Sequence, residues 1–169
     1  MPKEITYNEA LSKLANLCSR SEQCIMSCKE KLTKWGIEKG EAEKVIQYLL
    51  KEKYIDEKRY ARYFTKDKHQ LSHWGRTKIA HTLQAKQIPQ AFIESALEEI
   101  DEENYSDQLQ TLLNNKIKST KYKSLYDLKG KLYRFALSRG FESSLALKAI
   151  DTAIKNNNIK NRDEELFDI

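Results

Sequence analysis

One helical pattern occurs three times along this chain, and this internal repeat constrains the fold more than any other feature. The copies align on Gly36, Gln87 and Gly140, which are 51 and 53 residues apart. Apolar residues recur at the same distances from each anchor, in steps typical of one helix face. In chain order they are Cys28, Leu32, Ile37, Ala42, Ile46 and Leu49; Ile79, Leu83, Ile88, Ile93, Leu97 and Ile100; and Leu132, Ala136, Phe141, Ala146, Ile150 and Ala153. Each anchor therefore separates two amphipathic helices.

A further helix is predicted before each of these pairs. The candidates are residues 7–17, 56–69 and 104–116. Asp56 and Ser21 precede helical stretches and are suitable N-cap residues. Glycine at an anchor favours a left-handed helix end, and Pro89 after Gln87 suits the first turn of the next helix, so the break survives without a glycine there.

These features predict an all-α fold of three tandem three-helix repeats in an elongated, curved array. The predicted repeats are residues 1–54, 55–100 and 101–156, followed by an acidic tail at 157–169. The chain has only 5 glycines and 2 prolines, and most of its common residues favour helices. A repeat of about 50 residues has a small core, so it gains stability by packing against its neighbours.

The sequence favours a cytoplasmic protein. No apolar stretch approaches the roughly 18 residues of a membrane span. The first residues, MPKE, lack the apolar core of a signal peptide. We therefore expect no membrane partner.

Three cysteines, Cys18, Cys24 and Cys28, fall within one short stretch. An odd number of cysteines without an export signal argues against a disulfide framework, and free cysteine behaves as a small buried hydrophobe. Cys24 and Cys28 would share a helix face and could hold a metal, but no histidine is nearby and structural zinc takes four ligands. Core packing is favoured, with no metal and no other cofactor.

No group of residues points to catalysis. His69 and His73 are four residues apart but have no third ligand at a suitable spacing, so a surface or phosphate-contacting role is favoured over metal binding. Gly36 and Gly40 are not followed by the Gly-Lys-Ser/Thr of a phosphate-binding loop, which argues against ATP hydrolysis. We expect a protein that is not an enzyme and has no small-molecule substrate.

Basic and acidic residues occur in separate blocks. Residues 51–88 hold ten Lys or Arg against four Asp or Glu, residues 89–113 hold seven acidic residues and no basic one, and residues 114–160 hold eleven basic against three acidic. Basic surface zones attract phosphate. The alternative is a set of ordinary solvated helix faces.

Basic and aromatic residues interleave between positions 58 and 78. On a helix, Arg59, Arg62 and Lys66 would line one face because they are three and four residues apart. Residues near the start of the following helix would lie at its positive end, which favours an anion. Tyr60 and Phe64 are expected to be core anchors instead. The predicted binding surface consists of Arg59, Arg62, Lys66, Lys68, Arg76 and Lys78.

Several short motifs resemble those of a known family. Residues 54–61 (YIDEKRYA) are similar to a Gly-Tyr-Leu-Asp-Asp-x-Arg-Phe-Ala motif, with Lys53 where glycine is common. Residues 74–79 (WGRTKI) and 83–88 (LQAKQI) follow its next helices, with Gln87 in place of the usual glycine. The first repeat matches at 17–21 (LCSRS) and 31–36 (KLTKWG), and the third matches mainly by spacing. Together these motifs resemble the RecX family of RecA regulators.

The resemblance implies three repeats of a three-helix unit and a regulator without catalysis. Such a protein would bind along the RecA filament on single-stranded DNA, block its extension or promote its disassembly, and reduce strand exchange and co-protease activity. It would act in DNA recombination, DNA repair and the SOS response. The implied partners are the RecA filament and single- or double-stranded DNA, contacted through the basic side of the array.

Other function classes stay open on the residues alone. A helix-turn-helix transcription factor would need base-reading residues at the start of a recognition helix, where residues 90–94 and 142–145 are mostly apolar or acidic. Sequence-neutral DNA binding without RecA would show a steep loss of affinity with salt. An enzyme using metal held by the cysteines would be recognised by stoichiometric zinc.

Overall fold

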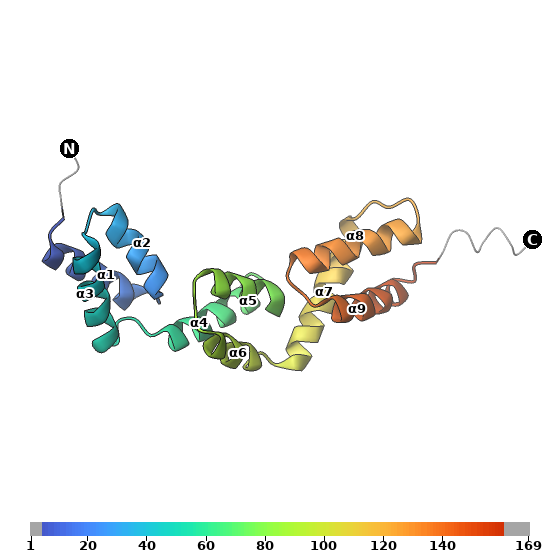
Figure 1. The fold of residues 1–169 in the computed structure, drawn as a ribbon. Coiled ribbons are helices and arrows are strands. Elements are labelled where there is room, and N and C mark those ends of the chain that lie inside the picture. Colours follow the sequence, from blue (N-terminus) through green and yellow to red (C-terminus); the bar gives the residue numbers. More distant parts are fainter. Residues whose placement is uncertain (1–4, 161–169) are drawn as a thin grey trace, which may run out of the picture. The chain divides into compact units, whose positions relative to one another are not determined.

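The computed structural model describes residues 5–160, and every regular element in that range is an α-helix (Figure 1). In chain order these are α1 (Tyr7–Arg20), α2 (Ile25–Lys34), α3 (Lys39–Lys51), α4 (Glu57–Gln70), α5 (Arg76–Ala85), α6 (Gln90–Glu98), α7 (Glu102–Ser119), α8 (Leu125–Ser138) and α9 (Ser143–Asn156). The all-α prediction is confirmed, and α1, α4 and α7 are the helices expected before each pair. None of the described helices is long and apolar enough to cross a bilayer.

The three anchor residues share one backbone conformation. Gly36, Gln87 and Gly140 have φ angles of 74°, 57° and 90°, all in the left-handed region. A hydrogen bond closes each turn from the next residue back to the carbonyl five positions earlier, which is the Schellman pattern of helix ends. The bonds are Ile37 to Leu32, Ile88 to Leu83 and Phe141 to Ala136, each with an N···O distance of 3.1 Å. The sequence repeat is therefore also a repeat of turn geometry.

Helix starts follow the predicted caps at α4 but not at α2. The Asp56 side chain accepts a hydrogen bond from the Arg59 N–H at 3.0 Å, as an N-cap does. The N-cap prediction for Ser21 is wrong, because α1 continues to Arg20 and the Ser21 N–H donates to the Leu17 carbonyl at 3.1 Å. Ser21 thus ends α1, and α2 begins only at Ile25.

Packing groups the helices into two compact units. Of the described residues, the first unit comprises 5–66 and 81–97, and the second comprises 67–80 and 98–160. The division falls inside α4 and inside α5. Neither unit coincides with one predicted repeat, and the repeat boundaries stay a prediction about the sequence.

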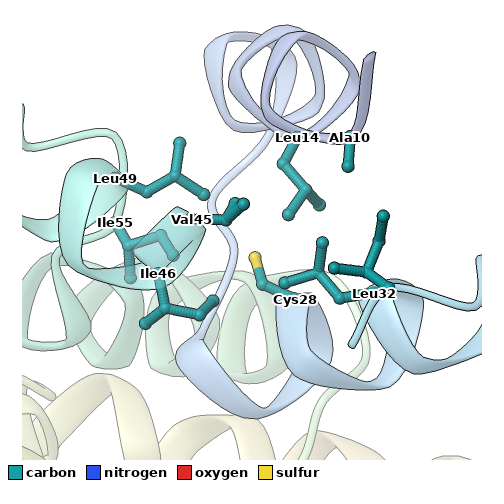
Figure 2. Packing of buried hydrophobic residues seen from close by; sticks show 9 residues of the cluster. Ala10, Leu14, Cys28, Leu32, Val45, Ile46, Leu49 and Ile55 are labelled. Atoms are coloured by element: carbon teal, nitrogen blue, oxygen red, sulfur yellow. The ribbon is translucent and has the colours of Figure 1, made fainter. Parts of the chain in front are cut away.

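In the first unit, side chains of α1, α2 and α3 form an aliphatic core. Figure 2 shows Ala10 and Leu14 of α1 facing Cys28 and Leu32 of α2, with Val45, Ile46 and Leu49 of α3 beside them. Cys24 and Cys28 are fully buried, which confirms the core-packing prediction for both. A hydrogen bond with the Cys18 thiol, together with burial, raises the pKa of Cys28.

In the second unit, two glycines allow backbones to meet directly. The Gly75 N–H donates to the Arg139 carbonyl at 2.7 Å, and the Thr77 N–H donates to the Gly140 carbonyl at 2.9 Å. A Cβ on Gly75 would lie 2.3 Å from the Gly140 carbonyl, closer than any side chain can approach. This contact joins the start of α5 to the turn between α8 and α9.

Candidate nucleic-acid interface

The predicted basic row begins on α4, in the first compact unit. Arg62 and Lys66 are exposed there, four residues apart on one face. Tyr60 is buried, which confirms its prediction as a core anchor, and its ring stacks on half-buried Phe64 with the centroids 5.9 Å apart. The helix therefore turns Tyr60 inward and Arg62 and Lys66 outward.

Arg59, at the start of α4, is engaged within the protein. Its Nε donates to Glu22 Oε1 at 2.6 Å. Its Nη2 donates to the carbonyls of Lys53 and Tyr54 at 3.2 and 3.4 Å. The hydrogen bond that Arg59 donates to Glu22 raises the pKa of Arg59. The pair ties the start of α4 to the link between α1 and α2, and Glu22 balances the arginine charge.

Arg76 is similarly engaged in the second unit. Its guanidinium lies 4.1 Å from the centroid of the Tyr105 ring, with Nη2 2.7 Å from Glu102 Oε1 and Nη1 3.6 Å from Glu142 Oε1. The Tyr105 hydroxyl donates to Glu142 Oε2 at 2.6 Å. Burial and this hydrogen bond raise the pKa of Tyr105. With only 20% of its side chain exposed, Arg76 stabilises the contact of α5 with α7 and α9.

Lys68 and Lys78 converge on one aromatic ring. Their ammonium nitrogens lie 5.1 and 4.4 Å from the centroid of the Trp74 ring, a distance at which a cation is attracted to the indole face. Both lysines are half-buried. The structure thus brings two of the six predicted residues together around the turn before α5.

The start of α5, predicted to favour an anion, already faces oxygens of the protein. The Arg76 N–H donates to the Tyr105 hydroxyl at 2.9 Å, and the Thr77 N–H donates to the Gly140 carbonyl at 2.9 Å. These two donors are consequently used within the fold.

The histidine prediction is wrong for His69, which is buried with 9% of its surface exposed. Its ring packs on Tyr105 with the centroids 5.7 Å apart, and burial lowers the pKa of His69. His73 is exposed and its Nδ1 lies 2.6 Å from Gln108 Nε2. Within residues 5–160, no three His, Cys, Asp or Glu side chains are placed to hold a metal ion.

Sequence reasoning missed the acidic partners of the two arginines. Glu102 belongs to the acidic block that follows the basic block of Arg76, so complementary blocks were a usable signal for this pair. No comparable pattern marks Glu22, which is 37 residues from Arg59. Arg59 and Arg76 therefore each have a carboxylate that balances their charge within the protein.

Comparison with known protein families gives two matches. Residues 56–97 match the model of the second three-helix domain of RecX, and residues 102–150 match the model of its third three-helix domain. Together the two matches cover more than half of the chain.

Curated relatives are named regulatory protein RecX. The protein of Clostridium botulinum (strain Eklund 17B / Type B) is 32% identical over 128 residues, which are 75% of this chain and 59% of that protein. The protein of Clostridium perfringens (strain 13 / Type A) is 30% identical over 146 residues, which are 83% of this chain and 68% of that protein. The chain spans 53% to 59% of the length of the relatives from C. botulinum and C. beijerinckii.

Two solved structures share the fold. The crystal structure of RecX from Lactobacillus salivarius superposes with a TM-score of 0.70 at 21% identity, covering 91% of this chain and 97% of that one. A second crystal structure, of a regulatory protein RecX, gives a TM-score of 0.71 at 18% identity, covering 86% of this chain and 73% of that one. At these identities the likeness concerns the fold.

Proposed function

The chain belongs to the RecX family of regulatory proteins, and we propose that it regulates the RecA recombinase by binding the filament that RecA forms on single-stranded DNA. Binding there slows filament extension or promotes disassembly, and so reduces strand exchange and co-protease activity. The protein would act without catalysis in the cytoplasm, in recombination, DNA repair and the SOS response.

The match to two successive three-helix domains of RecX is the observation that carries this proposal. The exposed cations agree with a partner that is rich in phosphate, because basic surface zones attract polyanions and speed their association. Arg62 and Lys66 are the exposed members on α4, and Lys68 and Lys78 gather at Trp74.

The six predicted residues take two roles in this proposal. Arg62, Lys66, Lys68 and Lys78 contact the filament. Arg59 and Arg76 hold the surface in place through their carboxylate partners. A reversal of charge at either arginine would disturb folding as well as binding, so the test avoids both.

The test measures ATP hydrolysis by the cognate RecA on single-stranded DNA while this protein is titrated in. The variant carries Arg62→Glu and Lys66→Glu, and the matched control carries Lys39→Glu and Lys44→Glu, an equal change of charge at two exposed positions of α3. Wild type and control should lower the rate in a dose-dependent manner. The α4 variant should need about tenfold more protein, equivalent to about 1.4 kcal/mol of binding free energy.

Circular dichroism establishes that both variants are folded. Equal potency of the α4 variant and the α3 control would exclude the α4 face as the contact surface. If wild type leaves the RecA rate unchanged yet binds single-stranded DNA without RecA, the regulatory proposal fails. Sequence-neutral DNA binding would then be the better account.

A further inference from the structure

A second basic surface lies in the second compact unit, outside the six residues considered above. An open groove of about 440 Å³ runs between the end of α7 and one face of α8. Three cations line it, Lys116, Lys131 and Arg134, together with Phe135 and three hydroxyl side chains. No carboxylate is among the described residues that line the groove.

Internal contacts position the cations of this groove without neutralising all of them. Lys131 Nζ lies 3.0 Å from Asp127 Oδ2 and donates to the Lys121 carbonyl at 2.7 Å, which leaves one of its three N–H donors. Lys116 Nζ lies 5.0 Å from the centroid of the Phe135 ring. The hydroxyl groups of the groove donate to carbonyls of their own helices, so the cations are the donors that face a ligand.

Arg134 has no carboxylate partner in the part of the chain that the structure describes. Its Nη1 lies 3.4 Å from the position that a Cβ on Gly130 would occupy. The guanidinium therefore lies back along α8 over a residue without a side chain, in the direction that long side chains take on a helix. Five N–H donors in a planar fork are consequently available to an anion.

The surroundings of the groove are strongly basic. Residues 114–135 include seven Lys or Arg and one acid, Asp127. The Lys123 N–H and the Lys131 ammonium both bind the Asp127 carboxylate and hold its pKa below the usual value, so this acid is already engaged. A polyanion is therefore a better fit than a single small anion, because cations extend beyond the groove itself.

An exposed aromatic ring lies on the same helix row. Tyr126 is 89% exposed in the first turn of α8, four residues before Gly130 and eight before Arg134. Positions four apart share a helix face. A flat exposed ring beside phosphate-binding cations is the combination that binds single-stranded nucleic acid, where cations contact the backbone and the ring stacks on an unpaired base.

We propose that the α7–α8 groove and Tyr126 form a binding site for single-stranded DNA. Lys116, Lys131 and Arg134 hold backbone phosphates, and Tyr126 stacks on a base. The choice of DNA over another polyanion rests on the proposed function. The site itself lies on different helices from Arg62 and Lys66 and acts without RecA.

The test is binding of a fluorescently labelled oligo(dT), followed by anisotropy. The groove variant carries Lys116→Gln and Arg134→Gln, and the control carries Lys148→Gln and Lys155→Gln, an equal loss of charge at exposed positions of α9. The groove variant should raise the Kd about tenfold and the control should leave it near the wild-type value. Tyr126→Ala should raise it about fivefold, and Tyr126→Phe should restore binding because stacking needs only the ring.

Three outcomes would overturn this site: equal binding by the groove variant and the α9 control, no effect of Tyr126→Ala, or competition by polyglutamate as strong as by unlabelled oligo(dT). The RecA assay separates the two proposals. If the groove variant still binds DNA and the wild-type protein still slows RecA, the groove proposal fails and the regulatory proposal stands. If the groove variant loses DNA binding and the wild-type protein has no effect on RecA, the result supports the groove proposal and refutes the regulatory proposal.

Discussion

Gln87 adopts a backbone conformation that glycine adopts in the two equivalent turns. Its φ of 57° lies in the left-handed region, where the Cβ of an ordinary residue comes too close to the following carbonyl oxygen. The turn still forms, because the Ile88 N–H reaches the Leu83 carbonyl at 3.1 Å. The local conformation is therefore imposed by the helices on either side of it.

We expect Gln87→Gly to raise the free energy of unfolding by about 0.5–1 kcal/mol. Relief of left-handed strain of about 1–2 kcal/mol outweighs the extra entropy that glycine gives the unfolded chain. Urea unfolding followed by circular dichroism measures the change. Gly36→Ala, which makes the opposite exchange at φ 74°, should lower stability. A less stable Gln87→Gly protein would show that the glutamine side chain itself stabilises the turn.

The candidate site could be predicted from sequence only in part at this scale. Spacing placed Arg62 and Lys66 correctly on an outer helix face, because helical periodicity alone decides that. The pairing of Arg59 with Glu22 depends on how the α1–α2 link packs beside α4, and no local pattern encodes it. Exposed cations and cations that support the fold look alike in a sequence.

At the scale of helices, backbone contact rather than side-chain packing joins the start of α5 to the turn before α9. Gly75 and Gly140 lie against each other, and a Cβ on Gly140 would come within 2.6 Å of the Lys78 backbone nitrogen. Apolar periodicity predicted both helices. It could not predict that two glycines 65 residues apart would meet, because a residue without a side chain contributes nothing to an apolar pattern.

Gly75→Ala should consequently destabilise the second unit by about 1–3 kcal/mol, the usual range for overpacking. The added methyl group would meet backbone atoms, which cannot move aside as a flexible side chain can. Thermal and urea unfolding would measure the loss. Gly40→Ala is the control, since nothing lies within 4 Å of its added carbon. If the two variants unfold alike, the close approach of residues 75 and 140 is not rigid.

Across the whole chain, the charge blocks seen in the sequence differ in how far their charges are neutralised within the protein. In the block 51–88, both Arg59 and Arg76 are neutralised by acids from elsewhere in the chain. In residues 114–135, one acid stands against seven bases. The sequence shows the net charge of each block. Tertiary contacts decide which basic residues of a block are neutralised within the protein. The sequence therefore did not single out the cations of the groove.

Binding to oligo(dT) should weaken steeply with salt. Three phosphate contacts on a single strand give a slope of about −2 in a plot of log K against log salt concentration, so a fourfold rise in salt costs about twentyfold in affinity. The variant that lacks Lys116 and Arg134 charges should show a slope of about −0.7. Anisotropy titrations over a range of KCl concentrations measure both. Identical slopes would contradict phosphate contact by these two side chains.

The division of α4 and α5 between two compact units limits how such a chain can be shortened or rebuilt. Residues 56–97 are one copy of the repeated pattern, yet 67–80 belong to one compact unit and the remainder to the other. An excised middle copy would hold fragments of two compact units and the whole of neither. Deleting residues 56–97 would therefore remove part of each compact unit rather than the whole of one.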